Sequence, residues 1–188
     1  MYIPSDPKIW REISHDSFIQ KRTLWILIIC AYMFPYAIKD FVPELVIVTD
    51  YMIHIISFLM PEVYKWIDRS SNSEATTILH IYLWFIFIPY LSYLLTKHKA
   101  YENGFVLTEL DSWRRFMKPL AIILFMSISL VLYKFVLPEM PNCNLLCIHG
   151  SMRVHTTFML CITSALAYSF AMIYWWFKNI KLIFAGQE

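Results

Sequence analysis

The sequence predicts an all-α integral membrane protein with four transmembrane helices, both termini in the cytoplasm and an interfacial helix in the first outer loop. Three observations lead to this fold class. Hydrophobic residues make up 59% of the 188 residues and charged residues only 16%, against roughly 45–50% and 25% in soluble domains. Several uncharged stretches are long enough to cross a bilayer. The basic residues also concentrate in alternate connecting segments. One soluble core of this size could not bury so much apolar surface.

The four spanning helices are predicted at 23–40, 77–96, 119–138 and 156–177, within a single transmembrane domain covering 1–188. A spanning helix needs about 20 mostly apolar residues. The first stretch, "TLWILIICAYMFPYAI", is short, and the stem of Lys39 completes its crossing. The third contains Lys134 near its far end, where the side chain can reach the membrane interface. The second and fourth are free of Lys, Arg, Asp and Glu.

The connecting segments follow from these spans: outer loops at 41–76 and 139–155, and a cytoplasmic loop at 97–118. Within the first outer loop, "YMIHIISFLMP" at 51–61 is apolar but shorter than a span. Stretches of this length are more often interfacial or buried in protein. We therefore expect an amphipathic helix on the membrane surface, with insertion of 51–61 as the alternative.

The distribution of basic residues sets the orientation. Cytoplasmic segments carry an excess of Lys and Arg. With four spans, eleven of the sixteen basic residues fall on the side that holds both termini, which predicts cytoplasmic termini and an inner (plasma) membrane location. A fifth span would distribute these eleven basic residues over both sides of the membrane. The eleven are Lys8, Arg11, Lys21, Arg22, Lys97, Lys99, Arg114, Arg115, Lys118, Lys178 and Lys181.

The second outer loop contains "MPNCNLLCIHGSMRVH", with two cysteines and two histidines. Cys-x3-Cys and His-x5-His each fit zinc spacings, but one residue separates the two pairs, too few for them to converge on one ion. A redox centre would normally show Cys-x-x-Cys. The favoured interpretation is a disulfide between Cys143 and Cys147 in an oxidising compartment, with free thiols as the alternative.

The sequence contains few residues that indicate haem binding, transport or catalysis. His54, His80 and His155 are predicted near the outer face, so a b-type haem is conceivable, but a lone His at a helix end is usually interfacial. The spans hold no mid-membrane charge of the kind that marks transport pathways. We find no nucleophile–base pair, Gly-rich phosphate loop or carboxylate dyad. The sequence therefore predicts a non-enzyme without a metal or cofactor, and its net charge of +2 gives no reason to expect nucleic acid.

Short motifs give a resemblance to a known family. Tyr93-Leu94-Leu95-Thr96 precedes Lys97 and Lys99 at the end of the second span, and Lys118-Pro119-Leu120 opens the third. With its length, helix number and long first outer loop, the chain resembles the four-helix immunity proteins of pore-forming colicins. The family's acidic-Leu-Thr motif after the third helix is replaced here by "PEMPNCNLLCIHG".

The resemblance implies a non-catalytic protein that binds the pore-forming domain of a bacteriocin inside the membrane. Small residues allow close helix–helix approach in lipid. We therefore predict a partner face in the fourth span, formed by Ser164, Ala165, Ala167, Tyr168 and Ser169. The same face could instead pack within the protein's own bundle.

Two other classes of function remain open from the sequence. The chain could be a structural or assembly subunit of a larger membrane complex, with its aromatic surfaces as permanent interfaces. It could also be a haem- or quinone-linked electron carrier. Membrane lipid is an expected partner in every case.

Overall fold

The computed structural model describes residues 7–41, 44–97, 112–131 and 151–178, and these residues contain helices and no strand. The helices of the first half are α1 (Pro7–Ile38), a short 3-10 turn η1 (Lys39–Phe41), α2 (Val46–Leu59) and α3 (Val63–Asp68). The chain continues through α4 (Ser73–Tyr82), a π-helical turn η2 (Leu83–Phe87) and α5 (Ile88–Thr96). The last two described helices are α8 (Ser112–Val131) and α9 (Met152–Lys178).

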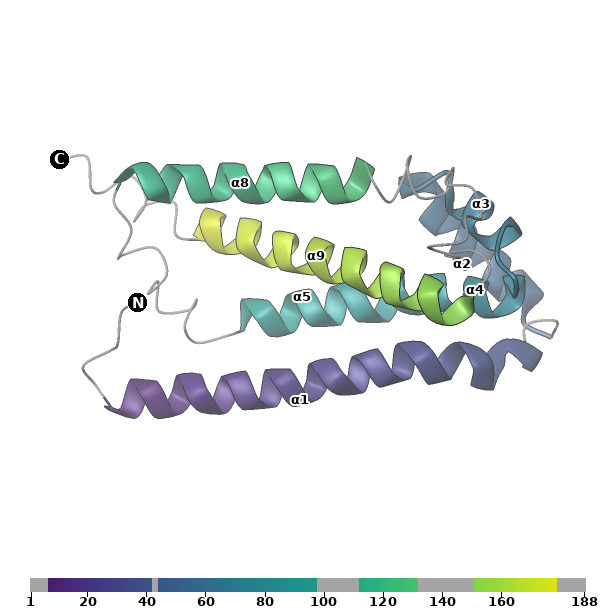
Figure 1. The fold of residues 1–188 in the computed structure, drawn as a ribbon, viewed down its shortest axis with the longest axis horizontal. Coiled ribbons are helices and arrows are strands. Elements are labelled where there is room, and N and C mark those ends of the chain that lie inside the picture. The colour runs from purple at the N-terminus through teal and green to yellow at the C-terminus, as the bar shows by residue number, and fades with distance from the viewer. Residues whose placement is uncertain (1–6, 42–43, 98–111, 132–150, 179–188) are drawn as a thin grey trace.

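The long helices lie side by side and alternate in direction, with α2 and α3 across one end of the bundle (Figure 1). We call this the α2–α3 end. At the opposite end α1 begins, α5 ends, α8 begins and α9 ends (Figure 1). The helix from α4 through α5 is continuous, and its η2 and α5 parts pack on α9, while α1 packs mainly on α4 and α8 mainly on α9.

Within the described part of the chain, three helices are long and apolar enough to cross a membrane: Lys21–Ile38, Ser73–Thr96 and Met152–Trp175. They contain most of the predicted spans 23–40, 77–96 and 156–177. The first helix extends further than expected, because the charged segment from Pro7 onward continues the same helix. The predicted span 119–138 coincides with α8 up to Val131, and its remaining residues lie outside the described part of the chain.

The helix predicted at 51–61 lies within α2 up to Leu59, and α2 begins earlier, at Val46; a second short helix, α3, follows from Val63. The backbone leaves the helical region at Met60, with φ −141° and ψ 81°. Pro61 explains the break, because a proline disfavours the helical conformation for the residue before it. Thr49, Ile53 and Ile56 form the buried face of α2, which packs on α4.

The second span is interrupted by the π-helical turn. The amide N–H of Ile88 donates to the carbonyl of Leu83, five residues earlier, instead of four. The next residue is Pro89, which has no N–H to continue the regular ladder. Such π-turns are rare and occur frequently at functional sites.

A single main core joins the helices. It contains residues of α1, α3, α4, η2, α5 and α9, among them the fully buried Trp66, Leu79, Leu83 and Met159. Side-chain hydrogen bonds connect neighbouring helices within it. The Tyr82 hydroxyl donates to the carbonyl of Leu27 at 2.9 Å, which links α4 to α1.

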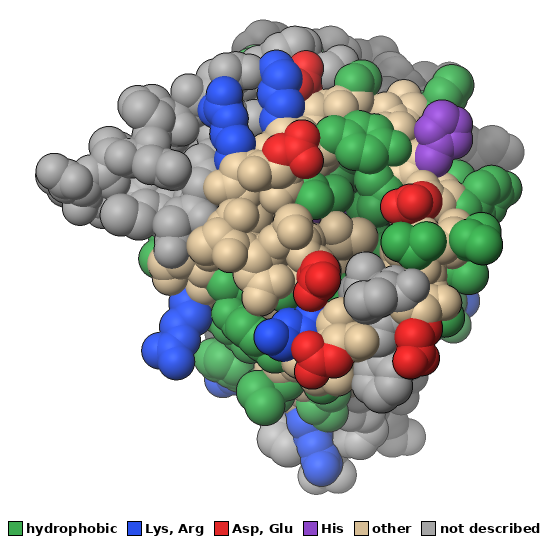
Figure 2. All heavy atoms as spheres, turned by 90° about the vertical axis from the view of Figure 1, so that its right-hand side faces the viewer, with side chains coloured by type: hydrophobic (Ala, Val, Ile, Leu, Met, Phe, Trp, Pro, Cys, Tyr) green, Lys and Arg blue, Asp and Glu red, His purple; other side chains and the backbone are tan. Residues whose placement is uncertain are grey.

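Figure 2 looks onto the α2–α3 end and shows acidic and basic side chains spread around it among apolar ones. Exposed Asp40, Glu44, Asp50, Asp68 and Glu74 belong to this part of the chain, and Glu62 pairs with Lys65 at 2.8 Å. The opposite end carries Lys97 over the ring of Tyr93 and Lys178 over that of Trp175, 5.7 and 4.7 Å from the ring centroids.

Candidate functional sites in the helix bundle

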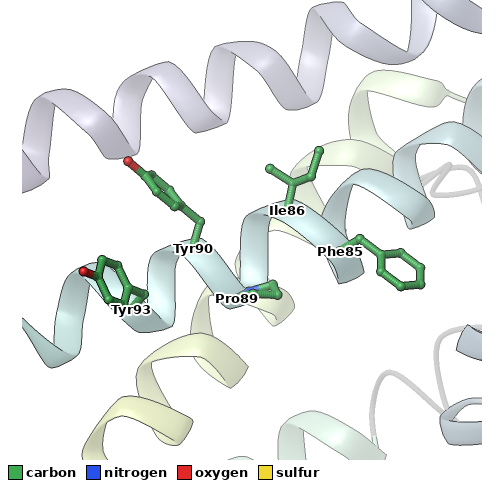
Figure 3. A pocket seen from close by; sticks show the side chains of 5 residues that line it. All are labelled: Phe85, Ile86, Pro89, Tyr90 and Tyr93. Carbon is green, nitrogen blue, oxygen red and sulfur yellow. The ribbon is translucent and has the colours of Figure 1, made fainter.

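An apolar pocket lies on the outward side of the π-helical turn and α5. Its volume is about 330 Å³. Figure 3 shows its lining side chains projecting from one stretch of helix, with Tyr90 and Ile86 on the side nearer α1. We call it the π-turn groove, lined by Phe85, Ile86, Pro89, Tyr90 and Tyr93.

The local sequence explains why this surface is open. The π-turn places one more residue in the turn than an α-helix would, so the adjacent Phe85 and Ile86 are both more than 40% exposed. Pro89, Tyr90 and Tyr93 continue the exposed strip one turn later. Aromatic and aliphatic side chains with little polar surface make this groove suitable for an acyl chain or an apolar helix.

The helix beside the groove is held along one narrow stripe. In the part of α1 whose burial is described, from Lys21 to Ile38, the buried residues are Leu27, Ala31 and Pro35, spaced four apart. Half-buried side chains flank this stripe. Trp25 and Met33 are apolar and exposed. Side chains of this kind on a long apolar helix are those expected to contact lipid or another membrane helix.

The structure distributes the predicted partner face around α9. Ala167 and Ser169 are fully buried, Ser164 and Ala165 are half-buried, and Tyr168 is 42% exposed. The carbonyl of Ala167 accepts a hydrogen bond from Ser92 of α5 at 3.3 Å. The Ser169 hydroxyl donates to the carbonyl of Ala165 in its own helix at 2.8 Å. Ala167 therefore faces the protein's own bundle, and the Tyr168 side of α9 is the accessible one.

Two of the three predicted outer histidines meet in the core near the α2–α3 end. The rings of His80 and His155 have centroids 5.8 Å apart, and both side chains are buried. Trp66 packs edge-on against His155 with a centroid distance of 5.2 Å. His54 is exposed on α2 and is not part of this group. We expected a histidine at a helix end to lie alone at the membrane interface, but His80 and His155 are buried and in contact with each other.

Haem does not fit this pair as packed. A porphyrin between the two imidazoles would need a broad slot separating α4 from α9. Trp66 packs directly against His155, and Leu79 and Met159, the neighbours of the pair in α4 and α9, are like Trp66 0% exposed in the same core. These side chains would have to be displaced, so the geometry gives no support for a haem carrier.

The cysteines divide into two groups. Cys143 and Cys147, the predicted disulfide, lie outside the described residues. Cys30 and Cys161 are free thiols in α1 and α9, the first half-buried and the second exposed. Among the described residues, there is no group of three or more His, Cys, Asp or Glu side chains that could hold a metal ion.

Sequence reasoning missed the π-turn groove and the surroundings of the histidine pair. Pro89 inside an apolar span was the available signal for the groove. For the histidines the signal was the spacing Met152-x2-His155-x3-Met159, which places all three side chains on one helix face.

Comparison with protein-family models, curated proteins and solved structures gives no match.

Proposed function

We propose that this chain is a non-catalytic immunity protein of the inner membrane, which protects its host by binding the pore-forming domain of a bacteriocin within the lipid. The observation that carries the proposal is the π-turn groove beside a weakly embedded α1. An apolar helix entering the membrane could lie along Phe85, Ile86 and Tyr90 without displacing any fully buried residue.

The packing of the bundle supports this role. In lipid there is no hydrophobic force between helices, so association depends on shape, small residues and hydrogen bonds. The groove supplies shape for a partner helix, and its Tyr90 and Tyr93 add hydroxyl groups at 46% and 57% exposure. Exposed Tyr168 and half-buried Ser164 of α9 offer a second contact surface.

The distribution of charge supports the proposed orientation. Cytoplasmic ends of spanning helices are enriched in Lys and Arg. Lys97 and Lys178 mark the opposite end of the bundle, whereas the α2–α3 end carries acidic side chains together with Lys39, Lys65, Arg69 and Arg153 (Figure 2). Six carboxylates against four basic side chains leave the α2–α3 end the more acidic one. We therefore place the α2–α3 end on the periplasmic side and both termini in the cytoplasm, with four spans including α8.

The test is toxin challenge of sensitive bacteria that express the chain, with membrane potential followed by a potential-sensitive dye. A panel of pore-forming colicins is added, each at the concentration that depolarises control cells. Preserved potential against one toxin and collapse with the others is the expected result. Collapse with every toxin would overturn the proposal.

Two variants locate the contact surface. Tyr90→Ala removes an aromatic ring from the groove and should abolish protection. Tyr174→Ala removes a ring of comparable exposure, 51% against 46%, from α9 and should leave protection intact. Equal protection by both variants would place the contact elsewhere. Equal amounts in the membrane fraction are the control for expression.

The second candidate is a structural or assembly subunit of a larger membrane complex. The exposed apolar side of α2 favours it, because Ile47 and Phe58 are 82% and 89% exposed. A partner that co-purifies in fixed ratio in the absence of toxin, combined with no protection, would support this function instead.

A further inference from the structure

The buried histidines belong to a group of side chains that matches the ligand preferences of a soft metal ion. We define the histidine–methionine cluster as His80, His155, Met152, Thr76 and Trp66. All five are buried, at 0–6% exposure. They come from α3, α4 and α9, so the cluster joins three helices at the α2–α3 end.

Helical spacing places a thioether one turn away from the two imidazoles. Thr76 is one turn before His80 in α4, and Met152 is one turn before His155 in α9. The Thr76 hydroxyl approaches the sulfur of Met152 at 3.5 Å, which shows that these turns face each other. The next turns, with His80 and His155, face each other in the same way. Met159 follows His155 by one turn and is fully buried.

The separation of the rings suits one shared ion. A metal bonded to an imidazole nitrogen at about 2.0 Å lies about 3.2 Å from that ring's centroid. Two rings on one ion are then about 6.4 Å apart in linear and about 5.2 Å apart in tetrahedral geometry. The observed centroid distance of 5.8 Å lies between these two values, with the ring planes inclined by 70°. The separation of the rings is therefore in the range of two imidazoles that share one ion.

The ligand types select the ion. Thioethers favour Cu(I), and imidazole binds it well, whereas carboxylates and carbonyls favour hard cations. A structural zinc site needs four ligands, and the described residues supply no third His, Cys, Asp or Glu at this place. The cost of burying an ion also rises with the square of its charge, which favours a monovalent ion between neutral ligands.

We propose that His80, His155 and Met152 form a buried binding site for a soft monovalent metal ion, of which Cu(I) and Ag(I) are the representatives. The ion exchanges its solvent ligands for two imidazole nitrogens and a thioether sulfur, without change of oxidation state. Trp66, packed against His155, holds that ring in position. The site is separate from the π-turn groove and does not depend on the proposed immunity function.

The test uses the full chain purified in detergent micelles, under anaerobic conditions, with Cu(I) competed against a chromogenic chelator. Thiols also bind Cu(I), so the measurement is made on the wild type and on a chain with Cys30, Cys143, Cys147 and Cys161 replaced by Ser. The expected result is one Cu(I) retained per cysteine-free chain. X-ray absorption should then show nitrogen and sulfur neighbours.

Two substitutions assign the ligands in the cysteine-free chain. His155→Gln should lower the affinity for Cu(I) by at least about 100-fold, and Met152→Leu by about 10-fold or more. Met33→Leu, at an exposed position of α1, should leave it unchanged. Because Leu matches Met in volume, Met152→Leu gives a decisive result even if His155→Gln does not fold.

Several results would overturn the proposal. These are loss of all Cu(I) with the cysteines, unchanged affinity in the folded Met152→Leu variant, or preferential uptake of Zn(II). Toxin challenge measures protection without added metal, so failure of the immunity function and failure of the metal site are observed separately.

Discussion

Replacement of Ala167 by Leu tests whether the small residues of α9 serve the protein's own bundle. Ala167 is fully buried where α9 packs on α5. Its carbonyl accepts the hydrogen bond from Ser92 at 3.3 Å. An isopropyl group at this position has to push the two helices apart and lengthen that hydrogen bond.

The expected loss of stability follows from these contacts. Overpacking of a well-packed core costs about 1–3 kcal/mol. An interhelical hydrogen bond in a membrane protein contributes about 0.6 kcal/mol. We therefore expect Ala167→Leu to lower the free energy of unfolding by about 2–4 kcal/mol.

Unfolding in mixed micelles, with increasing denaturing detergent and tryptophan fluorescence as the signal, measures this change. Ala165→Leu is the matched control, because Ala165 is half-buried two residues away. It should cost clearly less. If Ala167→Leu costs under about 0.5 kcal/mol, or if the two variants cost the same, the assignment of Ala167 to the α5 interface is wrong.

Three further substitutions test local contacts by the same unfolding measurement. Asn72→Ala removes the cap of α4, whose side-chain oxygen accepts from the amide of Ala75 at 3.0 Å, and should cost about 1 kcal/mol, with Asn72→Asp restoring it. Tyr82→Phe removes the hydroxyl that donates to Leu27 and should cost about 0.5–1.5 kcal/mol; an unchanged stability would mean that this hydrogen bond does not stabilise the contact between α4 and α1. Trp66→Ala empties a fully buried position and should cost about 3–5 kcal/mol, and Trp66→Phe less; an equal loss would contradict the packing of this site.

The positions of the long helices could be predicted because charge-free apolar stretches have few alternatives to a spanning helix. The ends of the helices were less predictable. In α1 the charged segment from Pro7 continues the helix, since backbone hydrogen bonds propagate past the edge of an apolar stretch. Pro61 indicated the break at Met60. That helices form on both sides of it could not be predicted, because α2 and α3 are stabilised by packing on α4.

The candidate sites depended more on which helices become neighbours. A run such as 164–169 covers the whole circumference of a helix, at 100° per residue. The sequence alone could not tell that Ala167 faces α5 while Tyr168 faces outward. The sequence placed His80 and His155 at the same end of the bundle. Their contact depends on how far α4 is shifted along α9, which the sequence does not give; the contact of Thr76 with Met152 results from the same register.

The packing of the bundle also explains why the groove and the histidine–methionine cluster have different properties. At the α2–α3 end, α1, α4 and α9 share a core and hydrogen bonds, including that between Tyr32 and Thr157 at 2.5 Å. Beside the π-turn groove, the described part of α1 has few contacts with α5. Moving α1 sideways there disrupts few of the described contacts, whereas any change around His155 disturbs three helices. A site for a partner helix needs a neighbour that moves easily, because it has to admit a large apolar surface. A site for a small buried ion needs rigid surroundings, because its ligands have to be held in place before the ion arrives.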